Sequence, residues 1–267
     1  MSEKSRIVMV AGSASHGGGS HEHPAGCAFF ADLLNEHVDG VEAVVFQGWP
    51  ENPETLTGAD AIIVYSDGGA RHLSIPHLEQ ISELMDQGVG LAMLHYAVEV
   101  PKGEPGDRFL DWIGGYFETH LSVNPHWTAT FTGFPEHPIT RGLDPFSLED
   151  EWYYHMRFRE NMDGVTPLLS AIAPESTLTR PDGPHSGNPH VRASVANSEP
   201  QHLAWCVERP DGGRGFGFTG GHYHNKWGDD QMRKLILNAI LWTAKKDVPE
   251  GGISTPTPTK AELDAYL

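Results

Sequence analysis

The sequence predicts an α/β fold: a mostly parallel sheet with helices on both faces and an inserted middle region. Short apolar runs alternate with segments whose apolar residues recur every three or four positions, which indicates strands alternating with helices. The strand-like runs are nearly continuous in apolar residues, as is typical of strands buried on both faces. From about 103 to 200 this alternation gives way to segments broken by Pro and Gly, and it returns afterwards.

The first half of the chain carries most of the regular pattern. Strands are expected at 7–10, 41–46, 61–65 and 90–94. A helix is expected at about 24–38, because Pro24 suits the first turn of a helix. A second amphipathic helix carries the apolar positions from Ile75 to Met85 and stops at Gly88.

The second half begins irregularly. We expect a short helix near 107–113, strands at 128–131, 152–156, 203–207 and 215–219, a long loop at 179–197 and a last helix at about 229–245. A loop of that length is often functional or mobile. We treat 1–246 as a single domain with an insertion at about 103–200, and 247–267 as a tail that either wraps around the domain or extends away.

Composition excludes several classes of protein. Of the 267 residues, 39% are hydrophobic and 20% charged, which excludes a disordered or coiled-coil chain. The 36 acidic and 18 basic residues give a net charge of −18, which repels nucleic acid and anionic membranes. We therefore expect no nucleic-acid or membrane partner and leave a homo-oligomer open; the partner expected from the arguments below is a small-molecule carbohydrate. The start shows no signal peptide, which predicts a cytoplasmic protein unless a leader has been removed.

The two cysteines, Cys27 and Cys206, lie among apolar residues, which predicts buried and chemically idle thiols. The 16 histidines are the unusual feature, because they cluster in loops. Polar loops follow predicted strands at 15–23, 66–72, 95–99 and 220–227. In open α/β sheets ligands bind outside the carboxyl ends of the strands, so these loops indicate a site.

Each loop also has a simpler interpretation. His222 and His224 share the i, i+2 spacing that points two side chains the same way in an extended segment, toward a metal or a substrate. They could instead cap the following helix. His21 and His23 have the same spacing, or mark an ordinary solvated helix entry. His95 could be a satisfied strand-end histidine, and the Asp67-Gly68-Gly69 run either a turn or a set of amides near a substrate oxygen.

The middle region places aromatic residues beside acids and histidines at 118–120, 124–127 and 149–155. Aromatic rings stack on the apolar faces of sugars while acids bind hydroxyl groups, so these segments suit a sugar-binding wall. The alternative is a solvated strand with buried aromatic residues.

The order of several motifs resembles the trehalose-utilisation (ThuA-like) family. The motifs are SDGGARH at 66–72, GLAMLHY at 90–96, HPITRGL at 137–143, GFGFTGGHYH at 215–224 and LNAILW at 237–242. The resemblance runs from Arg6 to about Lys245. It implies a flavodoxin-like fold similar to the class I glutamine amidotransferases, in which a cysteine nucleophile stands at a strand-to-helix elbow.

In this chain the resemblance puts His95 at the elbow, Asp67-Gly68-Gly69 in the oxyanion loop, and His222 and His224 in the late pair. Without a Cys or Ser at the elbow, a covalent glutaminase mechanism lacks its nucleophile. A cavity filled with imidazoles suits a divalent metal (Zn, Mn or Ni) or proton transfer instead.

These arguments lead to three groups of candidate residues. As catalytic groups we take His95, His120 and Asp67. As substrate-binding groups we take Gly68, Gly69, Arg71, Glu151, His21, His23, Trp127 and Tyr154. As metal ligands we take His222, His224 and His95, with Glu151 as a further carboxylate.

The resemblance implies a role in disaccharide catabolism through 3-keto intermediates. We therefore expect a metal-assisted lyase, hydrolase or isomerase that acts on 3-keto-glycosides, with no nucleotide cofactor. Two alternatives remain open: a non-catalytic carbohydrate-binding or sensing module, and a metal-dependent amidohydrolase-like enzyme.

Overall fold

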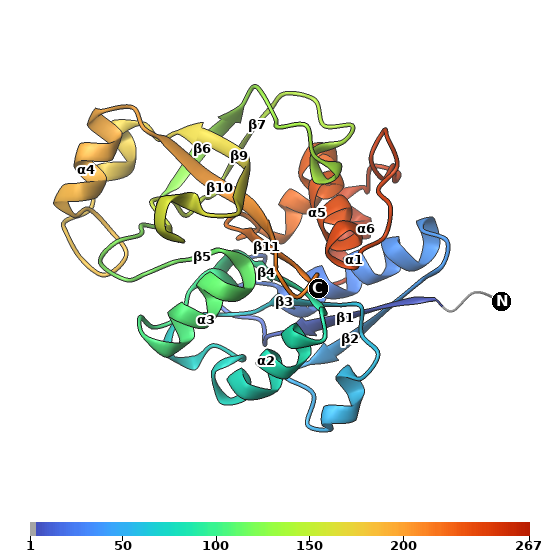
Figure 1. The fold of residues 1–267 in the computed structure, drawn as a ribbon. Helices are drawn as coiled ribbons and strands as arrows, with labels where there is room; N and C mark the ends of the chain where they lie inside the picture. Colours follow the sequence, from blue (N-terminus) through green and yellow to red (C-terminus); the bar gives the residue numbers. More distant parts are fainter. Residues whose placement is uncertain (1–3) are drawn as a thin grey trace.

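A computed structural model describes residues 4–267, and its centre is a seven-stranded sheet in the order β2-β1-β3-β4-β11-β10-β9 (Figure 1). The strands of this sheet are β1 (Ser5–Ala11), β2 (Val41–Gln47), β3 (Ala61–Tyr65), β4 (Gly90–Leu94), β9 (Val165–Ile172), β10 (Pro200–Glu208) and β11 (Arg214–Phe218). Neighbouring strands from β2 to β11 pair in parallel, while β10 is antiparallel to both β11 and β9. The predicted mostly parallel α/β fold is confirmed.

Helices cover both faces of the sheet. The α-helices are α1 (His23–His37), α2 (Leu78–Asp86), α3 (Glu104–Ile113), α4 (Pro189–Ala196), α5 (Asp230–Thr243) and α6 (Lys260–Asp264). Alternate residues of β1 point to opposite faces, so Ile7 and Met9 pack in the core that holds α1 and α5. Val8 and Val10 pack in the core that holds α2 and α3, which Figure 1 shows on the other side of the sheet.

The register aligns the carboxyl ends of the central strands. Ala11 pairs with Tyr65, Tyr65 with Leu94, and Leu94 with Phe218, so the four strands end on one line across the sheet. The residue that follows each strand therefore stands at the same edge. In a doubly wound sheet this is the edge where ligands bind.

The insertion supplies α3 and β9 to the main layers, and its other strands form a small layer beyond β9 and β10 (Figure 1). It contains a hairpin of β6 (His126–Phe131) and β7 (Phe146–Glu151), and a short pair, β5 (Gly115–Tyr116) with β8 (Arg157–Phe158). Short 3-10 helices connect many of the elements: η1 (Pro53–Leu56), η2 (Gly69–Arg71), η3 (Ile75–His77), η4 (His95–Val98), η5 (Pro138–Thr140), η6 (Glu160–Met162), η7 (Glu175–Leu178) and η8 (His224–Gly228).

Two expectations for the insertion are wrong, and the structure adds a strand, β9, for which there was no expectation. Pro167 interrupts the apolar run of β9, and Pro is accepted there because β9 is an edge strand. The expected loop at 179–197 contains α4, for which Pro189 supplies the first helical position. The expected strand at 152–156 is the segment after β7, where Tyr154 makes only an isolated bridge to Val123. Its aromatic residues reflect burial and not strand pairing.

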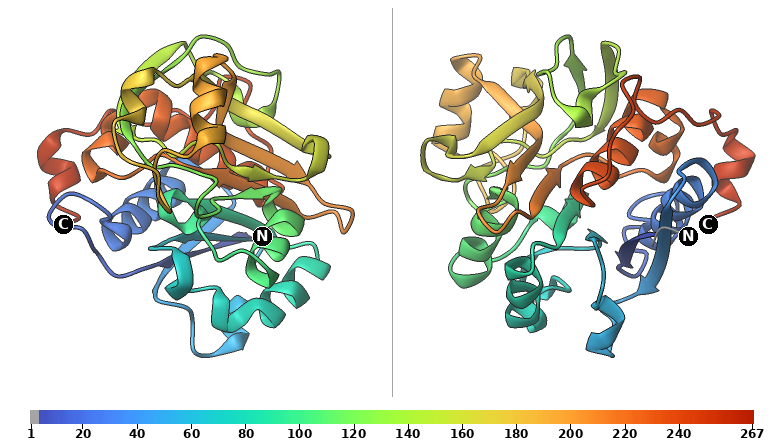
Figure 2. Two further views of the ribbon diagram at one scale, coloured as in Figure 1. Left: turned by 90° about the vertical axis from the view of Figure 1, so that its left-hand side faces the viewer. Right: turned by 45° about the vertical axis from the view of Figure 1, so that its right-hand side comes forward.

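The C-terminal tail wraps around the domain. Leu263 of α6 is buried, and the Tyr266 hydroxyl donates a hydrogen bond to Asp32 of α1 at 2.9 Å. Figure 2 shows the C-terminus beside this helix. The tail thus adds apolar cover to the face of the sheet that carries α1.

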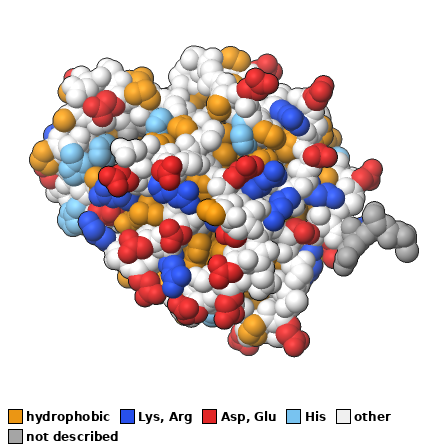
Figure 3. Space-filling model, viewed as in Figure 1, with side chains coloured by type: hydrophobic (Ala, Val, Ile, Leu, Met, Phe, Trp, Pro, Cys, Tyr) orange, Lys and Arg blue, Asp and Glu red, His pale blue; other side chains and the backbone are white. Residues whose placement is uncertain are grey.

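In Figure 3, Asp and Glu side chains are scattered over the face shown, and Lys and Arg side chains lie among them, several in a row across its middle. The chain as a whole carries a net charge of −18. Among residues 4–267, the helices are too short or too polar to cross a bilayer.

Candidate metal centre

Three histidines and one glutamate meet at the carboxyl edge of the sheet. His21 lies between β1 and α1, His95 follows β4 directly, and His222 lies in the loop after β11. Glu151, the last residue of β7, reaches this edge from the insertion. All four are buried, and one ligand atom from each lies within 4.8 Å of the others.

The contacts within this cluster are short. His21 Nε2 lies 3.0 Å from His222 Nδ1 and 3.1 Å from His95 Nε2. Glu151 Oε2 lies 3.0 Å from His222 Nδ1 and 3.5 Å from His95 Nε2. Burial alone would raise the pKa of Glu151, but hydrogen bonds with His222 and His95 hold it well below its usual range. The cluster therefore contains an ionised carboxylate.

Neighbouring acceptors determine which ring nitrogen of two histidines carries the proton. The Asp67 Oδ1 atom accepts a hydrogen bond from His21 Nδ1 at 2.8 Å, and the Thr219 carbonyl accepts one from His95 Nδ1 at 2.8 Å. Burial lowers the pKa of His21 to about 4, although Asp67 acts in the opposite direction. His21 is therefore neutral near pH 7, and its Nε2 carries a lone pair.

The Nε2 lone pairs of His21 and His95 point toward each other. In their neutral forms, His21 Nε2 and His95 Nε2 face each other at 3.1 Å with no proton between them. The Tyr153 hydroxyl, 3.1 Å from His95 Nε2, can donate to that atom, but the facing pair remains. A cation between these atoms would turn an unfavourable contact into coordination.

The spacing of the cluster fits a first-row divalent ion. With metal–nitrogen bonds of about 2.0–2.1 Å, tetrahedral ligand atoms stand roughly 3.3 Å apart. The atoms here are separated by 3.0 to 3.5 Å along their close contacts. Asp67 and Thr219 hold the outer nitrogens of two ligands, and Asn124 Nδ2 donates to Glu151 Oε1 at 3.1 Å. Such outer hydrogen bonds are typical of metal-binding histidines and carboxylates. The buried His/Glu cluster could therefore hold a metal.

Asp150 connects the insertion to the loop after β11. Its buried carboxylate accepts hydrogen bonds from the backbone of Gly221 at 2.8 Å and of His222 at 3.2 Å. Burial raises the pKa of this carboxyl group above its usual value. Sequence analysis did not single out Asp150, because its role is to hold a loop that is far away in sequence.

His95 stands at the turn from β4 into η4, where the family resemblance implies the elbow. Its φ is 54°, in the left-handed region that is uncommon for residues other than glycine. This turn redirects the chain from β4 into η4 and leaves the imidazole, which is fully buried, in the cluster. Backbone strain of this kind often accompanies functional sites.

The comparisons with known proteins agree with the fold and its motifs. A family model described as trehalose utilisation, ThuA, matches residues 7–243. The chain belongs to the ThuA family. No curated protein matches it in sequence.

Solved structures of ThuA-like proteins share the architecture. A putative ThuA-like protein from Bacteroides uniformis is 17% identical, with a TM-score of 0.59 over 92% of this chain and 94% of that one. One from Parabacteroides merdae is 12% identical, with a TM-score of 0.58 over 96% and 98%. The glutaminase domain of Trypanosoma brucei CTPS, with bound acivicin, is 10% identical, with a TM-score of 0.50 over 94% and 98%. These likenesses show a shared fold, which is the predicted class I glutamine amidotransferase-like one.

The structure of this ThuA-family chain brings part of the predicted site together. His95, His222, His21 and Glu151 form the cluster, and Asp67 lies directly behind His21. The sequence analysis proposed His224 as a metal ligand, but in the structure His21 and not His224 belongs to the cluster. The His224 ring instead donates from Nε2 to the carbonyl of Leu263 at 3.0 Å, in the tail.

The other predicted residues lie around or away from the cluster. The buried His23 ring donates to the Ser13 carbonyl, and Arg71 is exposed. A side chain at Gly68 would overlap the Tyr96 carbonyl, and the Gly69 amide donates to the Glu99 carbonyl. The Gly69 amide thus already has an acceptor within the protein.

Three predicted residues make contacts in the insertion. Trp127 donates to the Trp152 carbonyl, and the Tyr154 hydroxyl contacts Thr177 in the core. His120 is exposed, and its amide donates to the Pro184 carbonyl. None of these side chains is among the four of the cluster: Trp127 and Tyr154 pack inside the insertion, and the side chain of His120 is exposed.

Sequence analysis missed several neighbours of the cluster. Tyr153 lies against His95, and His126 Nε2 stands 3.9 Å from Glu151 Oε1 at a half-exposed position. Both lie in the aromatic segments singled out from the sequence. Alternation along those segments could have found them, because Tyr153 is two residues from Glu151 and His126 opposes Glu151 across the hairpin.

The two thiols are expected to play no part in the chemistry of the protein. Burial raises the pKa of Cys27 and raises that of Cys206 to about 12. We predict that a Cys27→Ala/Cys206→Ala variant keeps the metal content and turnover of the native protein. Metal analysis and a rate assay on the folded variant check this, and loss of activity with native thermal stability would contradict it.

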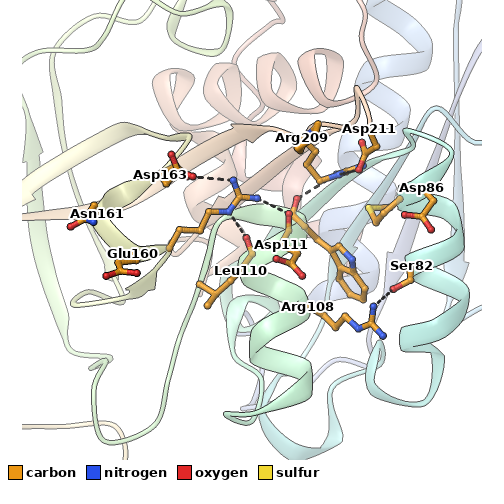
Figure 4. Close-up of a pocket in the computed structure, with 14 residues that line it drawn as sticks. Ser82, Asp86, Arg108, Leu110, Asp111, Glu160, Asn161, Asp163, Arg209 and Asp211 are labelled. Carbon is orange, nitrogen blue, oxygen red and sulfur yellow. Dashed lines mark hydrogen bonds and ion pairs between the residues drawn. The ribbon is translucent and has the colours of Figure 1, made fainter.

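A hollow of about 1040 Å³ lies at the opposite edge of the sheet (Figure 4). It borders the segments before β4 and β11, where Arg209 donates to the carbonyls of Val89 and Trp112. Arg159 likewise donates to the carbonyls of Leu110 and Asp111 at the end of α3. Arg159 and Arg209 thus stabilise backbone ends, while the third arginine of the hollow, Arg108, donates to the side chains of Ser82 and Glu79.

Proposed function

We propose that this protein is a metal-assisted enzyme that cleaves 3-keto-glycosides by elimination. The observation that carries the proposal is the convergence of the His21, His95 and His222 nitrogens with the Glu151 carboxylate. Membership of the ThuA family, which is described as trehalose utilisation, supports a carbohydrate substrate, and the 3-keto form is part of the proposal.

The four side chains suit Zn, Mn or Ni, because imidazole and carboxylate ligands together bind such ions well. When bound there, a divalent ion would act as a Lewis acid that stabilises negative charge developing on a carbonyl oxygen. His21 and His95 would bind the ion through their Nε2 atoms, because their Nδ1 protons are donated to Asp67 and Thr219. Both rings are therefore oriented before substrate arrives.

Exposure of the four side chains indicates how a substrate would approach. His21 and His95 are almost completely buried, whereas the side chains of Glu151 and His222 are 11% and 10% exposed. On that side, the His126 ring lies 5.1 Å from the His222 ring, and the Tyr223 ring lies 4.4 Å from it. These rings supply flat surfaces that suit the apolar face of a sugar.

The reaction follows from the chemistry of the substrate. A ketone at C3 makes the proton on C2 acidic, so a base can remove it and leave an enolate. Collapse of the enolate breaks the bond between C1 and the glycosidic oxygen, which departs after taking up a proton. His95 cannot supply the base, because both of its nitrogens face groups that are already in place.

Metal removal tests the proposal. Purified protein should contain about one divalent ion per chain, and a chelator should abolish release of the aglycone from a 3-keto-glucoside. Restoring Zn, Mn or Ni should restore the rate, because the four ligand side chains remain in place. His37→Ala, a change on the surface at the end of α1, serves as a control that keeps both properties.

The alternatives give different results in the same assay. Sugar binding without turnover, with or without metal, would identify a carbohydrate-binding module. Metal-dependent hydrolysis of amides with no action on sugars would identify an amidohydrolase-like enzyme. Either result would overturn the proposed reaction.

A further inference from the structure

Glu99 and His185 form a close pair near the metal centre that the proposed function leaves without a role. His185 Nε2 lies 3.0 Å from Glu99 Oε1 and 3.1 Å from Oε2. The Glu99 side chain is 4% exposed and that of His185 is 36% exposed. Among residues 4–267, His185 is the only side chain within hydrogen-bond distance of this carboxylate.

Glu99 lies in contact with the loops that surround the metal centre. It follows η4, which begins at the ligand His95, and its carbonyl accepts the Gly69 amide at 2.9 Å. The loop of Gly69 also carries Asp67, which orients the ligand His21. The buried carboxylate is thus placed by the same two loops that place two ligands.

His185 lies in the segment before α4, and from there its ring reaches the Glu99 carboxylate. Its ring stacks on Phe117 at 5.3 Å between centroids, and Phe117 lies 5.4 Å from the ring of Tyr153. The Tyr153 hydroxyl in turn contacts His95 Nε2 at 3.1 Å. Phe117 and Tyr153 therefore connect the ring of His185 to His95 in the centre.

The backbone of His185 is tied to the centre by a second route. Its carbonyl accepts hydrogen bonds from the Asn124 amide at 3.2 Å and from Arg180 Nη2 at 3.0 Å. The side chain of the same Asn124 donates to the ligand Glu151 at 3.1 Å. Asn124 therefore connects the backbone of His185 to the ligand Glu151.

A histidine with one nitrogen on a buried carboxylate is the arrangement that orients a general base in hydrolases. The carboxylate fixes the ring and stabilises the imidazolium that forms when the ring takes up a proton. The hydrogen bond that His185 donates to Glu99 raises the pKa of His185, while burial acts in the opposite direction. The ring is partly exposed, so a substrate could reach its other nitrogen.

We propose that His185 is the catalytic residue that removes the C2 proton of the 3-keto-glycoside, with Glu99 as its positioning residue. This inference rests on the proposed function. His185 takes the proton from C2, and the C–H electron pair forms the enolate with the C3 ketone. As the enolate collapses, the C1–O bond breaks, C1 and C2 become doubly bonded and the ketone returns.

The same histidine completes the proton balance. The departing glycosidic oxygen takes the proton from the His185 imidazolium, which returns to its neutral form. The products are an alcohol and a cyclic enone, and no oxidant, reductant or further proton donor is needed. The proton on C2 and the glycosidic oxygen on C1 are carried by adjacent carbon atoms. One histidine can therefore take the proton from C2 and give it to the oxygen.

A purely structural pair would only hold the segment before α4 in place. The same segment carries an ion pair of Arg192 with Asp182 at 2.8 Å, which offers a matched control. Arg192→Ala loosens this segment without touching His185 or Glu99. His185→Gln keeps an amide that can donate to Glu99 but cannot carry a proton in catalysis.

The test compares His185→Ala, His185→Gln, Glu99→Gln and Arg192→Ala by metal content, thermal stability and kcat on a 3-keto-glucoside. Both His185 variants should keep the bound ion and lose about 10²–10⁴-fold in kcat, the usual effect of losing a general base. Arg192→Ala should keep a kcat within a few-fold of the native value.

The pH profile gives a readout that a structural role would not change. A base works when unprotonated, so kcat/KM rises with pH through the pKa of His185. Removing the charge of Glu99 lowers that pKa, and the acidic limb of Glu99→Gln should therefore shift to lower pH.

Several outcomes would overturn the inference. A His185→Gln variant with native kcat would show that only the position of the segment matters, as would an equal loss in Arg192→Ala. An unshifted acidic limb in Glu99→Gln would remove the role of Glu99. Native protein that holds the ion but ignores the ketone overturns the proposed function and this inference with it.

Discussion

His21→Ala is expected to lose the bound divalent ion and to reduce turnover of a 3-keto-glycoside by about 10²–10⁴-fold. His21 Nε2 makes the two short contacts between ring nitrogens in the cluster, at 3.0 Å to His222 Nδ1 and 3.1 Å to His95 Nε2. Removing the His21 ring leaves only three of the four side chains that could bind the ion. Metal analysis after gel filtration, together with the rate assay, measures both effects.

His224→Ala provides the matched comparison, because the histidines of the two i, i+2 pairs are alike in sequence. Since the His224 ring contacts the Leu263 carbonyl, this variant should lose some thermal stability and keep its ion. Full metal content in His21→Ala, or metal loss in His224→Ala, would show that the structure assigns the wrong histidine. Glu151→Gln should behave like His21→Ala, because it removes the anionic ligand.

The second large effect is discrimination between a 3-keto-glycoside and the parent glycoside. The ratio of their kcat/KM values should exceed about 10⁴, which corresponds to ~5.5 kcal/mol in the barrier. The parent lacks the carbonyl that makes the C2 proton acidic, and no histidine of the site replaces that activation. Chromatography of the released aglycone from both substrates gives the ratio.

Other results in this comparison would change the assignment. Equal turnover of both substrates would indicate ordinary glycoside hydrolysis by a pair of carboxylates, one acting as acid. Glu151 would then act on the bond and not on an ion. Tight binding of both sugars without turnover would leave a binding protein that has kept the fold.

The regular part of the fold could be predicted because its signals are local. The strands at 61–65 and 90–94 have the same bounds in the structure, since each is an uninterrupted apolar run between polar turns. Strand β9 could not be found in this way, because Pro167 interrupts its apolar run and is tolerated only at the edge of the sheet.

The edge of the sheet that carries the site was also predictable. His95 and the loop at 220–227 follow buried strands, and parallel strands end on the same side. Glu151 is different, since it comes from the insertion and reaches the edge through Asp150, which accepts the amides of Gly221 and His222. That contact spans distant parts of the chain and leaves no periodic signal.

By itself, the sequence determined the fold class, the edge of the sheet and the presence of histidine pairs there. Only the tertiary structure decided which histidine of each pair faces the centre. His21 and His222 lie in loops at the edge, whereas His23 begins α1 and His224 begins η8. The start of a helix turns the second histidine of each pair into the packing around it. The i, i+2 rule holds only while the chain stays extended, and where it stops being extended is set by packing.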